Sequence, residues 1–365
     1  MYAWVATGRL TMSRDEHTAT LLNDGRVLIC CGRSDDIGPV RTAELFDPQT
    51  GACTPTGSLF YDRAGHTATL LPSGKVIVVG GADINDYTPT NTELYDPQSG
   101  EWYATGRIKQ ARFFHAAALL TNGRVLVAGG STIDGPLTSA EEYDPVRQVW
   151  TVVGPMREAR SGLTLTPLLD GRALAVSGVN AELYDPQSQT WSPANSFTVP
   201  RADHTATRLA DGRVLIAGGA SMVGMPYDPP LQASVSSCEL YDPASGAWSV
   251  VGSLLSARRA HAAALSNGMV LATGGIDKSL GGILWETLSS AELFDPSSLQ
   301  WTPMASMTTE RFAHTLTILP AARRLALPFG GPLAFVAGGR GAQTTALASN
   351  EVYETGIFLP PRPLA

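Results

Sequence analysis

Carboxylates and arginines that could carry acid–base chemistry recur at one place in a repeated sequence block. Two variable residues follow each of seven spaced arginines, and these pairs are Asp15-Glu16, Ala64-Gly65, Phe113-Phe114, Ser161-Gly162, Ala202-Asp203, Arg259-Ala260 and Phe312-Ala313. Asp15, Glu16 and Asp203 suit general acid–base catalysis, and adjacent carboxylates can have separated pKa values. Arg259 could hold a carboxylate or stabilise an oxyanion. We predict these four residues as catalytic; the alternative is a solvated rim without chemistry.

A second set of residues could bind a ligand without reacting with it. They follow the repeated arginines, follow later glycine-rich turns, or lie in two long loops, residues 220–237 and 276–290. The predicted ligand-binding residues are Arg33, Asp83, Phe113, Phe114, Ser161, Tyr227, Trp285, Phe312 and Arg340. A few charges among aromatic side chains are typical of a small-molecule pocket. We expect the two long loops to form a lid with a gap at the fourth block; surface ornament is the alternative.

The repeated block must supply the elements that position these residues. It reads R-x-x-H-T-A-T-L-L-x-D-G-R-V-L-I-x-G-G and then A-E-L-Y-D-P-x-S-G-x-W, with its arginines at 14, 63, 112, 160, 201, 258 and 311. Short alternating segments predict four antiparallel strands per block. Asp-Gly and Asn-Gly pairs, as at Asp24-Gly25, predict two-residue hairpins between the first two strands. One such sheet cannot bury both faces alone, so neighbouring sheets must stack.

The two ends of the chain predict that the seven sheets close into a ring. The last block stops at Glu351-Val352-Tyr353, before any fourth strand, and residues 3–8 match the fourth-strand segment 101–106. We therefore expect residues 1–10 to supply the outer strand of the seventh sheet. The predicted fold class is an all-β, seven-bladed β-propeller with four antiparallel strands per blade, as a single domain over residues 1–365.

The double glycine, the tyrosine after it and the later tryptophan resemble the Kelch repeat, as at Gly80-Gly81, Tyr95 and Trp102. The chain is most similar to bacterial stand-alone Kelch propellers, and the resemblance covers essentially all of it. Chain direction places the arginine ends and the double-glycine ends of all blocks on one rim. The resemblance implies that this rim is the binding face, because Kelch substrate adaptors bind peptides there and Kelch enzymes use it too. It leaves the function open, since a fold is a scaffold for sites.

All six histidines occupy one repeat position, at 17, 66, 115, 204, 261 and 314, with Leu163 in the fourth block. Packed sheets lie about 10 Å apart, whereas the ligands of one metal lie about 2 Å from it. We therefore predict structural histidines bonded to neighbouring backbone. Copper-radical oxidases share the repeat, but we expect no cysteine on the rim and no neighbouring histidines. The iron site of plant nitrile-specifier Kelch proteins is only half matched, at Asp62/His66 and Glu310/His314. We expect no metal and no cofactor.

Two further residue types have a structural interpretation. The seven arginines are matched by the glutamates Glu44, Glu93, Glu141 or Glu142, Glu182, Glu239, Glu292 and Glu351, which predicts structural ion pairs. The cysteines Cys30, Cys31, Cys53 and Cys238 show no pairing pattern, so we expect reduced core residues. Cys30 and Cys31 are adjacent in a predicted strand and should point to opposite faces.

Composition narrows the class of partner. The net charge of −7 argues against nucleic acid, which needs a lysine and arginine surplus. We find no signal peptide pattern and no apolar stretch long enough to span a membrane, so we expect a cytoplasmic monomer. Our first hypothesis is a cofactor-free enzyme that acts on a small organic molecule by non-redox acid–base chemistry, of isomerase, cyclase or lyase type. The alternatives are a module that binds a peptide or protein on the same face, and a structural or carbohydrate-binding propeller.

Overall fold

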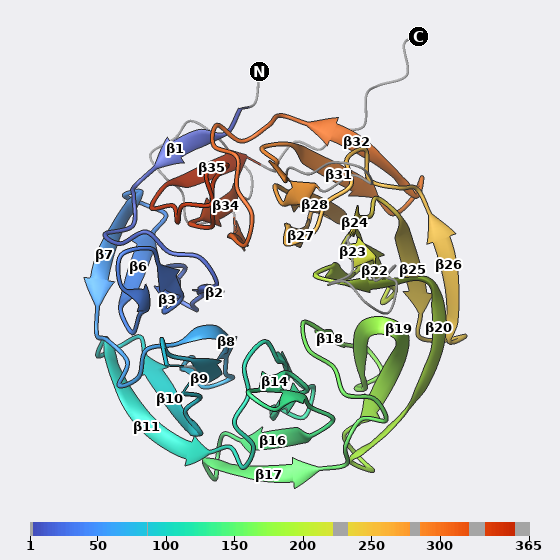
Figure 1. Ribbon diagram of the computed structural model, residues 1–365, viewed down its shortest axis with the longest axis horizontal. Helices are drawn as coiled ribbons and strands as arrows, with labels where there is room; N and C mark the ends of the chain where they lie inside the picture. Colours follow the sequence, from blue (N-terminus) through green and yellow to red (C-terminus); the bar gives the residue numbers. More distant parts are fainter. Residues whose placement is uncertain (1–2, 86, 222–232, 278–284, 321–332, 355–365) are drawn as a thin grey trace.

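Seven antiparallel sheets surround a central axis in the part of the chain that the computed structural model describes, residues 3–85, 87–221, 233–277, 285–320 and 333–354 (Figure 1). The innermost strands, in blade order, are β2 (Thr18–Leu21), β8 (Ala64–Leu70), β12 (Ala116–Leu119), β18 (Thr164–Pro167), β21 (Thr205–Arg208), β27 (Ala262–Ser266) and β33 (Thr315–Leu319). The second strands are β3 (Val27–Cys30), β9 (Val76–Ala82), β13 (Val125–Ala128), β19 (Ala173–Asp185), β22 (Val214–Ala217), β28 (Met269–Thr273) and β34 (Leu333–Ala337). Each second strand returns antiparallel to the first.

The outer half of each blade follows the same order. The third strands are β6 (Ala43–Asp47), β10 (Asn91–Asp96), β16 (Ala140–Asp144), the second part of β19, β25 (Cys238–Asp242), β31 (Ala291–Asp295) and β35 (Asn350–Glu354). The peripheral strands are β7 (Ala52–Thr56), β11 (Glu101–Arg107), β17 (Val149–Val153), β20 (Thr190–Ala202), β26 (Ala247–Val251), β32 (Gln300–Met304) and β1 (Val5–Thr7). Strand β19 runs through blade four without a separate loop, as the short connection there predicts.

Short two-stranded extensions stand on the connections between second and third strands. They are β4 (Arg33–Ser34) with β5 (Gly38–Pro39), β14 (Ser131–Thr132) with β15 (Gly135–Pro136), β23 (Ala220–Ser221) with β24 (Ala233–Ser234), and β29 (Ile276–Asp277) with β30 (Glu286–Thr287). The β23–β24 pair also joins the blade-four sheet, because β23 pairs with the end of β20. These extensions begin directly after the double-glycine position. They therefore rise from the rim that carries the predicted site residues.

The ring closes as the chain ends predict. Each innermost strand contacts the next, and β33 contacts β2 to complete the circle. Strand β1 pairs antiparallel with β35, in the register Val5↔Val352 and Thr7↔Asn350. Trp4 is buried, and its Nε1 donates to the Ala305 carbonyl 2.9 Å away. The N-terminal strand therefore completes blade seven and also ties it to blade six.

The hairpins between first and second strands differ from the two-residue prediction. In blade one, Gly25 N–H donates to Leu22 O, Leu22 N–H donates to Arg26 O, and Gly25 has a φ of 88°. This is a three-residue loop, a type I turn followed by a left-handed glycine. Only in blade six, among the described blades, do both loop residues have positive φ, at Asn267 and Gly268, with Ser266 paired to Met269. In blades one to five the prediction was wrong because one more residue separates the paired strands.

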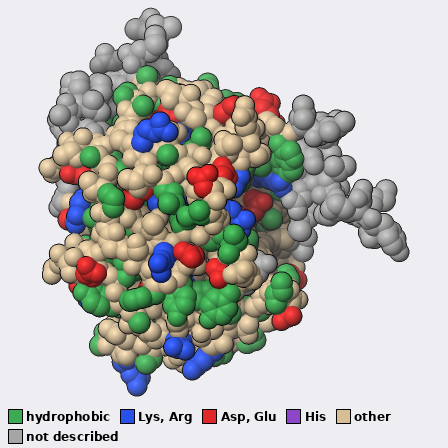
Figure 2. Space-filling view, turned by 60° about the vertical axis from the view of Figure 1, so that its left-hand side comes forward, with side chains coloured by type: hydrophobic (Ala, Val, Ile, Leu, Met, Phe, Trp, Pro, Cys, Tyr) green, Lys and Arg blue, Asp and Glu red, His purple; other side chains and the backbone are tan. Residues whose placement is uncertain are grey.

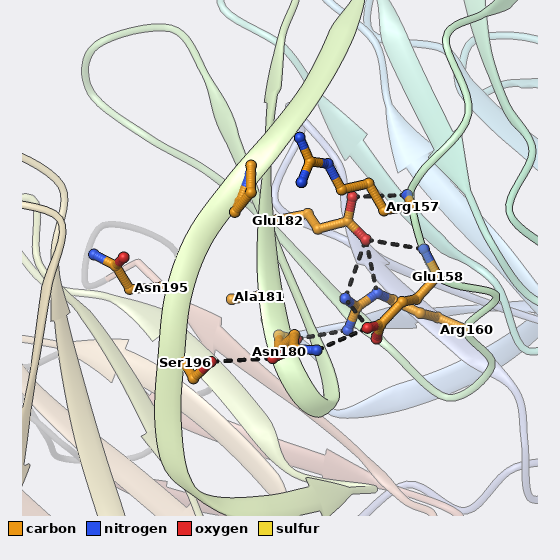
Figure 3. A pocket seen from close by; sticks show the side chains of 9 residues that line it. Arg157, Glu158, Arg160, Asn180, Ala181, Glu182, Asn195 and Ser196 are labelled. Atoms are coloured by element: carbon orange, nitrogen blue, oxygen red, sulfur yellow. Dashed lines mark hydrogen bonds and ion pairs between the residues drawn. The ribbon is translucent and has the colours of Figure 1, made fainter.

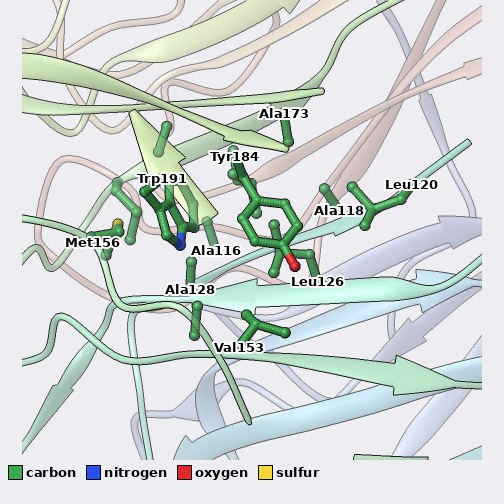
Figure 4. Packing of buried hydrophobic residues seen from close by; sticks show 14 residues of the cluster. Ala116, Ala118, Leu120, Leu126, Ala128, Val153, Met156, Ala173, Tyr184 and Trp191 are labelled. Carbon is green, nitrogen blue, oxygen red and sulfur yellow. The ribbon is translucent and has the colours of Figure 1, made fainter. Parts of the chain in front are cut away.

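The core lies between the blades. Between blades three and four, Ala116, Ala128, Met156, Tyr184 and Trp191 belong to one buried apolar cluster (Figure 4). The tyrosine or phenylalanine of the third strand packs on the tryptophan of the fourth, with ring centroids 5.0 to 5.2 Å apart in six blades, Trp4 with Tyr353 included. Small side chains on the inner strands let neighbouring sheets approach closely, which fixes where the rim residues meet.

The surface carries both signs of charge. Lysine and arginine side chains lie interspersed with aspartate and glutamate on the face that Figure 2 shows, among neutral residues. Within the described ranges, no helix has the length and apolar character needed to cross a membrane.

Candidate functional site

The second variable residue of each pair forms part of a ring of left-handed backbone, here called the rim ring. Its φ angles are 51° at Glu16, 66° at Gly65, 49° at Phe114, 60° at Gly162, 53° at Asp203, 50° at Ala260 and 49° at Ala313. Backbone hydrogen bonds join neighbours: Phe114 N–H donates to Gly65 O at 2.8 Å, and Ala313 N–H donates to Ala260 O at 2.9 Å. A left-handed residue with a side chain costs about 1–2 kcal/mol, so the surrounding ring must hold it there. Variable residues from separate blades are thus brought to one rim.

In six blades the first variable residue of the pair lies beside the residue that follows the second glycine. Antiparallel backbone bridges pair Asp15 with Arg33, Phe113 with Ser131, Arg259 with Ile276, and Phe312 with Arg340. The two sets of predicted residues therefore lie side by side. The sequence could not show this pairing, because it depends on where β-bridges continue beyond the double glycine.

Asp15 is the most buried of the predicted catalytic residues, with 3% exposure. Its Oδ2 accepts a hydrogen bond from Arg340 Nε of blade seven at 2.7 Å. Arg340 also pairs with Asp35 at 3.2 Å. Burial raises the pKa of Asp15, and the bond from Arg340 opposes this. Asp15 therefore holds Arg340 across the seam at which the ring closes.

Glu16 has the electrostatic character of an acid–base group. Burial raises its pKa above the ordinary value of 4.5, the neighbouring charge of Asp15 raises it further, and Arg33 and Arg340 oppose both. Its Oε2 is buried and has no hydrogen-bond partner within the described part of the chain. An unsatisfied carboxylate oxygen is costly, which marks this atom as one that a ligand or a proton could engage.

Asp203 and Arg259 lie on blades five and six, away from the blade-one pair. The Arg259 guanidinium stacks on the Trp285 ring, 4.1 Å from its centroid. Burial lowers the pKa of Arg259, and the charge of Asp203 opposes this. Asp203 is exposed on the rim ring. The predicted catalytic residues thus fall into two groups, one at the seam of blades seven and one, the other beside Trp285.

The predicted aromatic residues line the rim. Phe113 and Phe114 pack edge to face, with centroids 5.5 Å apart, and Phe114 is 44% exposed. Gly65 makes room for Phe114, because a Cβ at Gly65 would lie 2.9 Å from the Phe114 ring. Phe312 is half-buried. Tyr227 lies outside the described residues.

Two other predicted ligand residues have structural tasks. Asp83 Oδ1 accepts the backbone N–H groups of Asn85 and Tyr87, so this carboxylate holds its own loop. Ser161 is half-buried, and its carbonyl accepts the Ser177 hydroxyl at 3.4 Å. The sequence could not distinguish Asp83 from a ligand-binding residue, because its two bonds to backbone N–H groups depend on how the loop turns.

The histidines are structural, but their partners differ from the prediction. His115 Nε2 pairs with the Thr67 hydroxyl of the preceding blade at 2.8 Å, and His66, His204, His261, His314 and His17 pair with Thr18, Thr164, Thr205, Thr273 and Thr315. The predicted backbone partner was wrong because a threonine hydroxyl of the preceding blade faces each histidine ring. Five of these threonines lie on the innermost strand, and the sixth, Thr273, lies on β28 of blade six. Burial lowers the pKa of His17 and of His204 to about 3, which keeps these rings neutral.

The arginine–glutamate pairs are confirmed in all seven blades. Their N···O distances run from 2.5 to 3.2 Å, in Arg14–Glu44, Arg63–Glu93, Arg112–Glu141, Arg160–Glu182, Arg201–Glu239, Arg258–Glu292 and Arg311–Glu351. Each arginine also donates to the carbonyl at the first-glycine position, as Arg63 does to Gly80 O at 2.7 Å. The Nη atoms of these buried arginines bond to a carboxylate and to backbone carbonyls, as Arg63 does to Glu93 and Gly80, so we interpret the pairs as structural and not catalytic.

A hollow of about 230 Å³ opens at blade four (Figure 3). Asn180 donates to Glu158 at 2.7 Å and accepts from Ser196 at 3.1 Å, so these three polar side chains of the hollow are bonded to one another. The short connection between residues 178 and 181 contributes Asn180 to this hollow. Much of the two loops that were expected to form a lid lies outside the described residues, so the lid and its gap at blade four stay predictions. The hollow is a weaker candidate than the rim because Glu158, Asn180 and Glu182, which line it, already have bonded partners.

Cys30 and Cys31 do not point to opposite faces as the strand prediction required. Strand β3 ends at Cys30, and Cys31 has a φ of 58°. The left-handed turn brings both thiols to the same side, where they meet His66 of blade two. The alternation of a strand does not extend through a left-handed residue.

Seven sheets that are arranged in a closed ring, with their variable residues on one rim, define the class of protein as a seven-bladed β-propeller. The Kelch motif family matches residues 112–157 and 257–308, and with this fold it makes the chain a Kelch-repeat propeller. An F-box/kelch-repeat protein of Arabidopsis thaliana is 35% identical over 74 residues, which are 20% of this chain and only 15% of that protein. A fungal alcohol oxidase of the AA5 family, solved in complex with copper, superposes with a TM-score of 0.74 at 19% identity, over 97% of this chain and 76% of that one. At this identity the likeness shows the fold alone.

Proposed function

We propose that the rim at blades seven and one binds a small organic anion and carries non-redox acid–base chemistry of isomerase, cyclase or lyase type, without a cofactor. The observation that supports this most strongly is Glu16, a half-buried carboxylate with a raised pKa and an unbonded buried oxygen. A carboxylic acid whose pKa lies nearer to neutral pH is a better proton donor and acceptor at neutral pH.

Each neighbour of Glu16 has a separate role in this proposal. The exposed Arg33 holds an anionic group of the substrate. Asp15 positions Arg340, whose guanidinium adds positive charge beside Glu16. Glu16 then takes a proton from the bound molecule and returns it at a second position, so the reaction neither gains nor loses electrons.

The test is hydrogen exchange in heavy water. The protein is incubated with a panel of small carboxylic acids that carry an acidic C–H bond, and deuterium incorporation is followed by mass spectrometry. We expect at least one acid to exchange, and Glu16→Gln to lower that rate by about 10²–10⁴-fold, the usual contribution of a general acid or base. Glu158→Gln, in the blade-four hollow, is the matched control.

Two results would contradict the proposal. One is exchange that proceeds equally in wild type and in the Glu16→Gln variant. The other is an acid panel that neither binds nor exchanges.

A second candidate, a peptide-binding module on the same rim, is favoured by its exposed aromatic side chains. Phe114 and Trp285 are each 44% exposed. Exposed aromatic residues are common anchors at protein interfaces. A displayed random-peptide library selected on the protein would favour this candidate if Phe114→Ala and Trp285→Ala abolish binding while Glu16→Gln does not.

A further inference from the structure

Blade one departs from the repeat at the first-glycine position, where Cys31 replaces glycine. The equivalent residues in five other blades are Gly80, Gly129, Gly218, Gly274 and Gly338. A Cβ at Gly80 would lie 2.7 Å from the His115 ring of the next blade and 2.3 Å from the Arg112 carbonyl. Cys31 adopts the same left-handed φ, 58°, although it carries a side chain. A thiol therefore occupies a crowded position that most blades keep empty, which calls for a specific reason.

Two thiols and an imidazole meet at this position. The ligand atoms of Cys30, Cys31 and His66 all lie within 4.8 Å of one another, and all three residues are buried. Cys30 Sγ lies 4.0 Å from His66 Nε2. His66 Nε2 also pairs with the Thr18 hydroxyl at 3.0 Å, and its Nδ1, like that of the other five histidines, has no hydrogen-bond partner among the described residues. The group spans two blades, because both cysteines belong to blade one and His66 to blade two.

We propose that Cys30, Cys31 and His66 bind a zinc ion that joins blade one to blade two. Thiolate and imidazole are the ligands that zinc prefers in proteins, and three protein ligands leave one position of its tetrahedron open. Two thiolates and a neutral imidazole balance the charge of Zn²⁺, so the buried complex carries no net charge. Binding releases the two thiol protons to solvent and changes no oxidation state.

The polar atoms around Cys30 also come from both blades. The Thr18 hydroxyl of blade one lies 3.3 Å from Cys30 Sγ, and His66 Nε2 of blade two lies 4.0 Å from it. The proposed ion goes beyond the proposed function, since it acts on the join between blades and not on a substrate.

The repeat itself supplies substitutions that its fold accepts. Cys31→Gly restores the residue of five other blades, Cys30→Ala copies Ala128, Ala217 and Ala337, and His66→Leu copies Leu163. Cys238→Ala is the matched control, because Cys238 is a buried cysteine whose equivalents are Ala43, Ala140, Ala181 and Ala291. The full chain is produced in zinc-supplemented medium and dialysed, and zinc per chain is measured by plasma mass spectrometry. A cobalt(II)-loaded sample is examined for the thiolate-to-metal charge-transfer band.

We expect one zinc per wild-type chain, and zinc reduced to background in Cys30→Ala and Cys31→Gly, with loss of the cobalt band. His66→Leu should weaken binding, and Cys238→Ala should retain full occupancy. Removal of zinc by a chelator should lower the melting temperature of the wild type but not of Cys31→Gly. Background zinc in the wild type, or undiminished zinc in Cys30→Ala and Cys31→Gly, would overturn the proposal. Copper(I) binding without zinc binding would overturn the assignment of a divalent ion.

Discussion

Glu16 combines a strained backbone with an incompletely satisfied side chain. Its φ of 51° places a charged residue where two other rim-ring positions have glycine, and its Oε2 lacks a partner in the described residues. The same ring position holds Phe114 and Asp203 in other blades. The rim-ring positions share one backbone conformation but carry different side chains, so the fold can stay the same while the chemistry of the rim varies. At this scale, the proposed function depends on the few rim-ring positions that carry a reactive or bulky side chain.

The pKa of Glu16 has a consequence for stability that can be measured. Because the folded-state pKa is raised above the ordinary value of 4.5, the folded protein holds this proton more tightly than the unfolded chain does. Stability from this group is therefore present below about pH 4.5 and is lost as the pH rises through the folded-state pKa. As the pH rises through this range, we expect the free energy of unfolding of Glu16→Gln to increase relative to that of the wild type. Urea unfolding at a series of pH values gives this difference.

The control for this series is Glu101→Gln, which removes one negative charge from the exposed surface of β11. It corrects for the change in net charge. A Glu16→Gln difference that decreases as the pH rises would contradict the assignment of a raised pKa.

At the scale of elements, the double glycine fits blades together. The first glycine faces the histidine ring and arginine carbonyl of the next blade, and the second faces the histidine Cβ of its own blade, as at Gly218 and Gly219. The histidine is then held by a threonine of the preceding blade, as His261 is by Thr205. The double glycine and the H-T segment therefore form one contact that recurs around the ring.

Gly218→Ala tests this contact. Its added Cβ would lie 2.5 Å from the Arg258 carbonyl, at a φ of 62°. We expect a loss of about 3 kcal/mol or more in the free energy of unfolding, from the left-handed strain and the overlap with backbone together. Gly268→Ala is the control, since its φ is 79° but nothing lies within 4 Å of the added Cβ. It should cost only about 1–2 kcal/mol. Equal losses in denaturant unfolding would show that overlap between blades is unimportant.

At the scale of the whole molecule, stability depends on a contact between residues at the two ends of the described chain. Blade seven takes three strands from the end of the chain and β1 from its beginning. Without β1, β35 would present an unpaired edge, which invites pairing with other molecules. The candidate site depends on the same closure, because Arg340 of blade seven bonds to Asp15 of blade one.

Trp4→Ala should weaken the closure of the ring. Trp4 is 4% exposed, and its ring centroid lies 5.2 Å from that of Tyr353. Truncation of a buried tryptophan typically costs about 3–5 kcal/mol. Thermal unfolding should show the loss, with more aggregation than in wild type. Trp285→Ala, at 44% exposure, should change stability by only about 0.5 kcal/mol. A Trp4→Ala variant as stable as Trp285→Ala would show that the ring does not depend on this latch.

Sequence alone determined the seven blades, their closure through the N-terminal strand, and the seven arginine–glutamate pairs. These follow from local patterns that recur, so each copy supports the same interpretation. It also identified the rim and its variable residues, although their roles as site residues stay predictions.

Only the tertiary structure decided which of those residues meet. Asp15 bonds to Arg340, Asp83 holds its own loop, and Cys30 and Cys31 turn together toward His66. Each outcome depends on contacts between blades or on a left-handed backbone angle, and neither can be read from residue spacing. The repeated sequence specifies the structure that all blades share. The candidate site residues are those that differ between blades, and their contacts depend on the neighbouring blade.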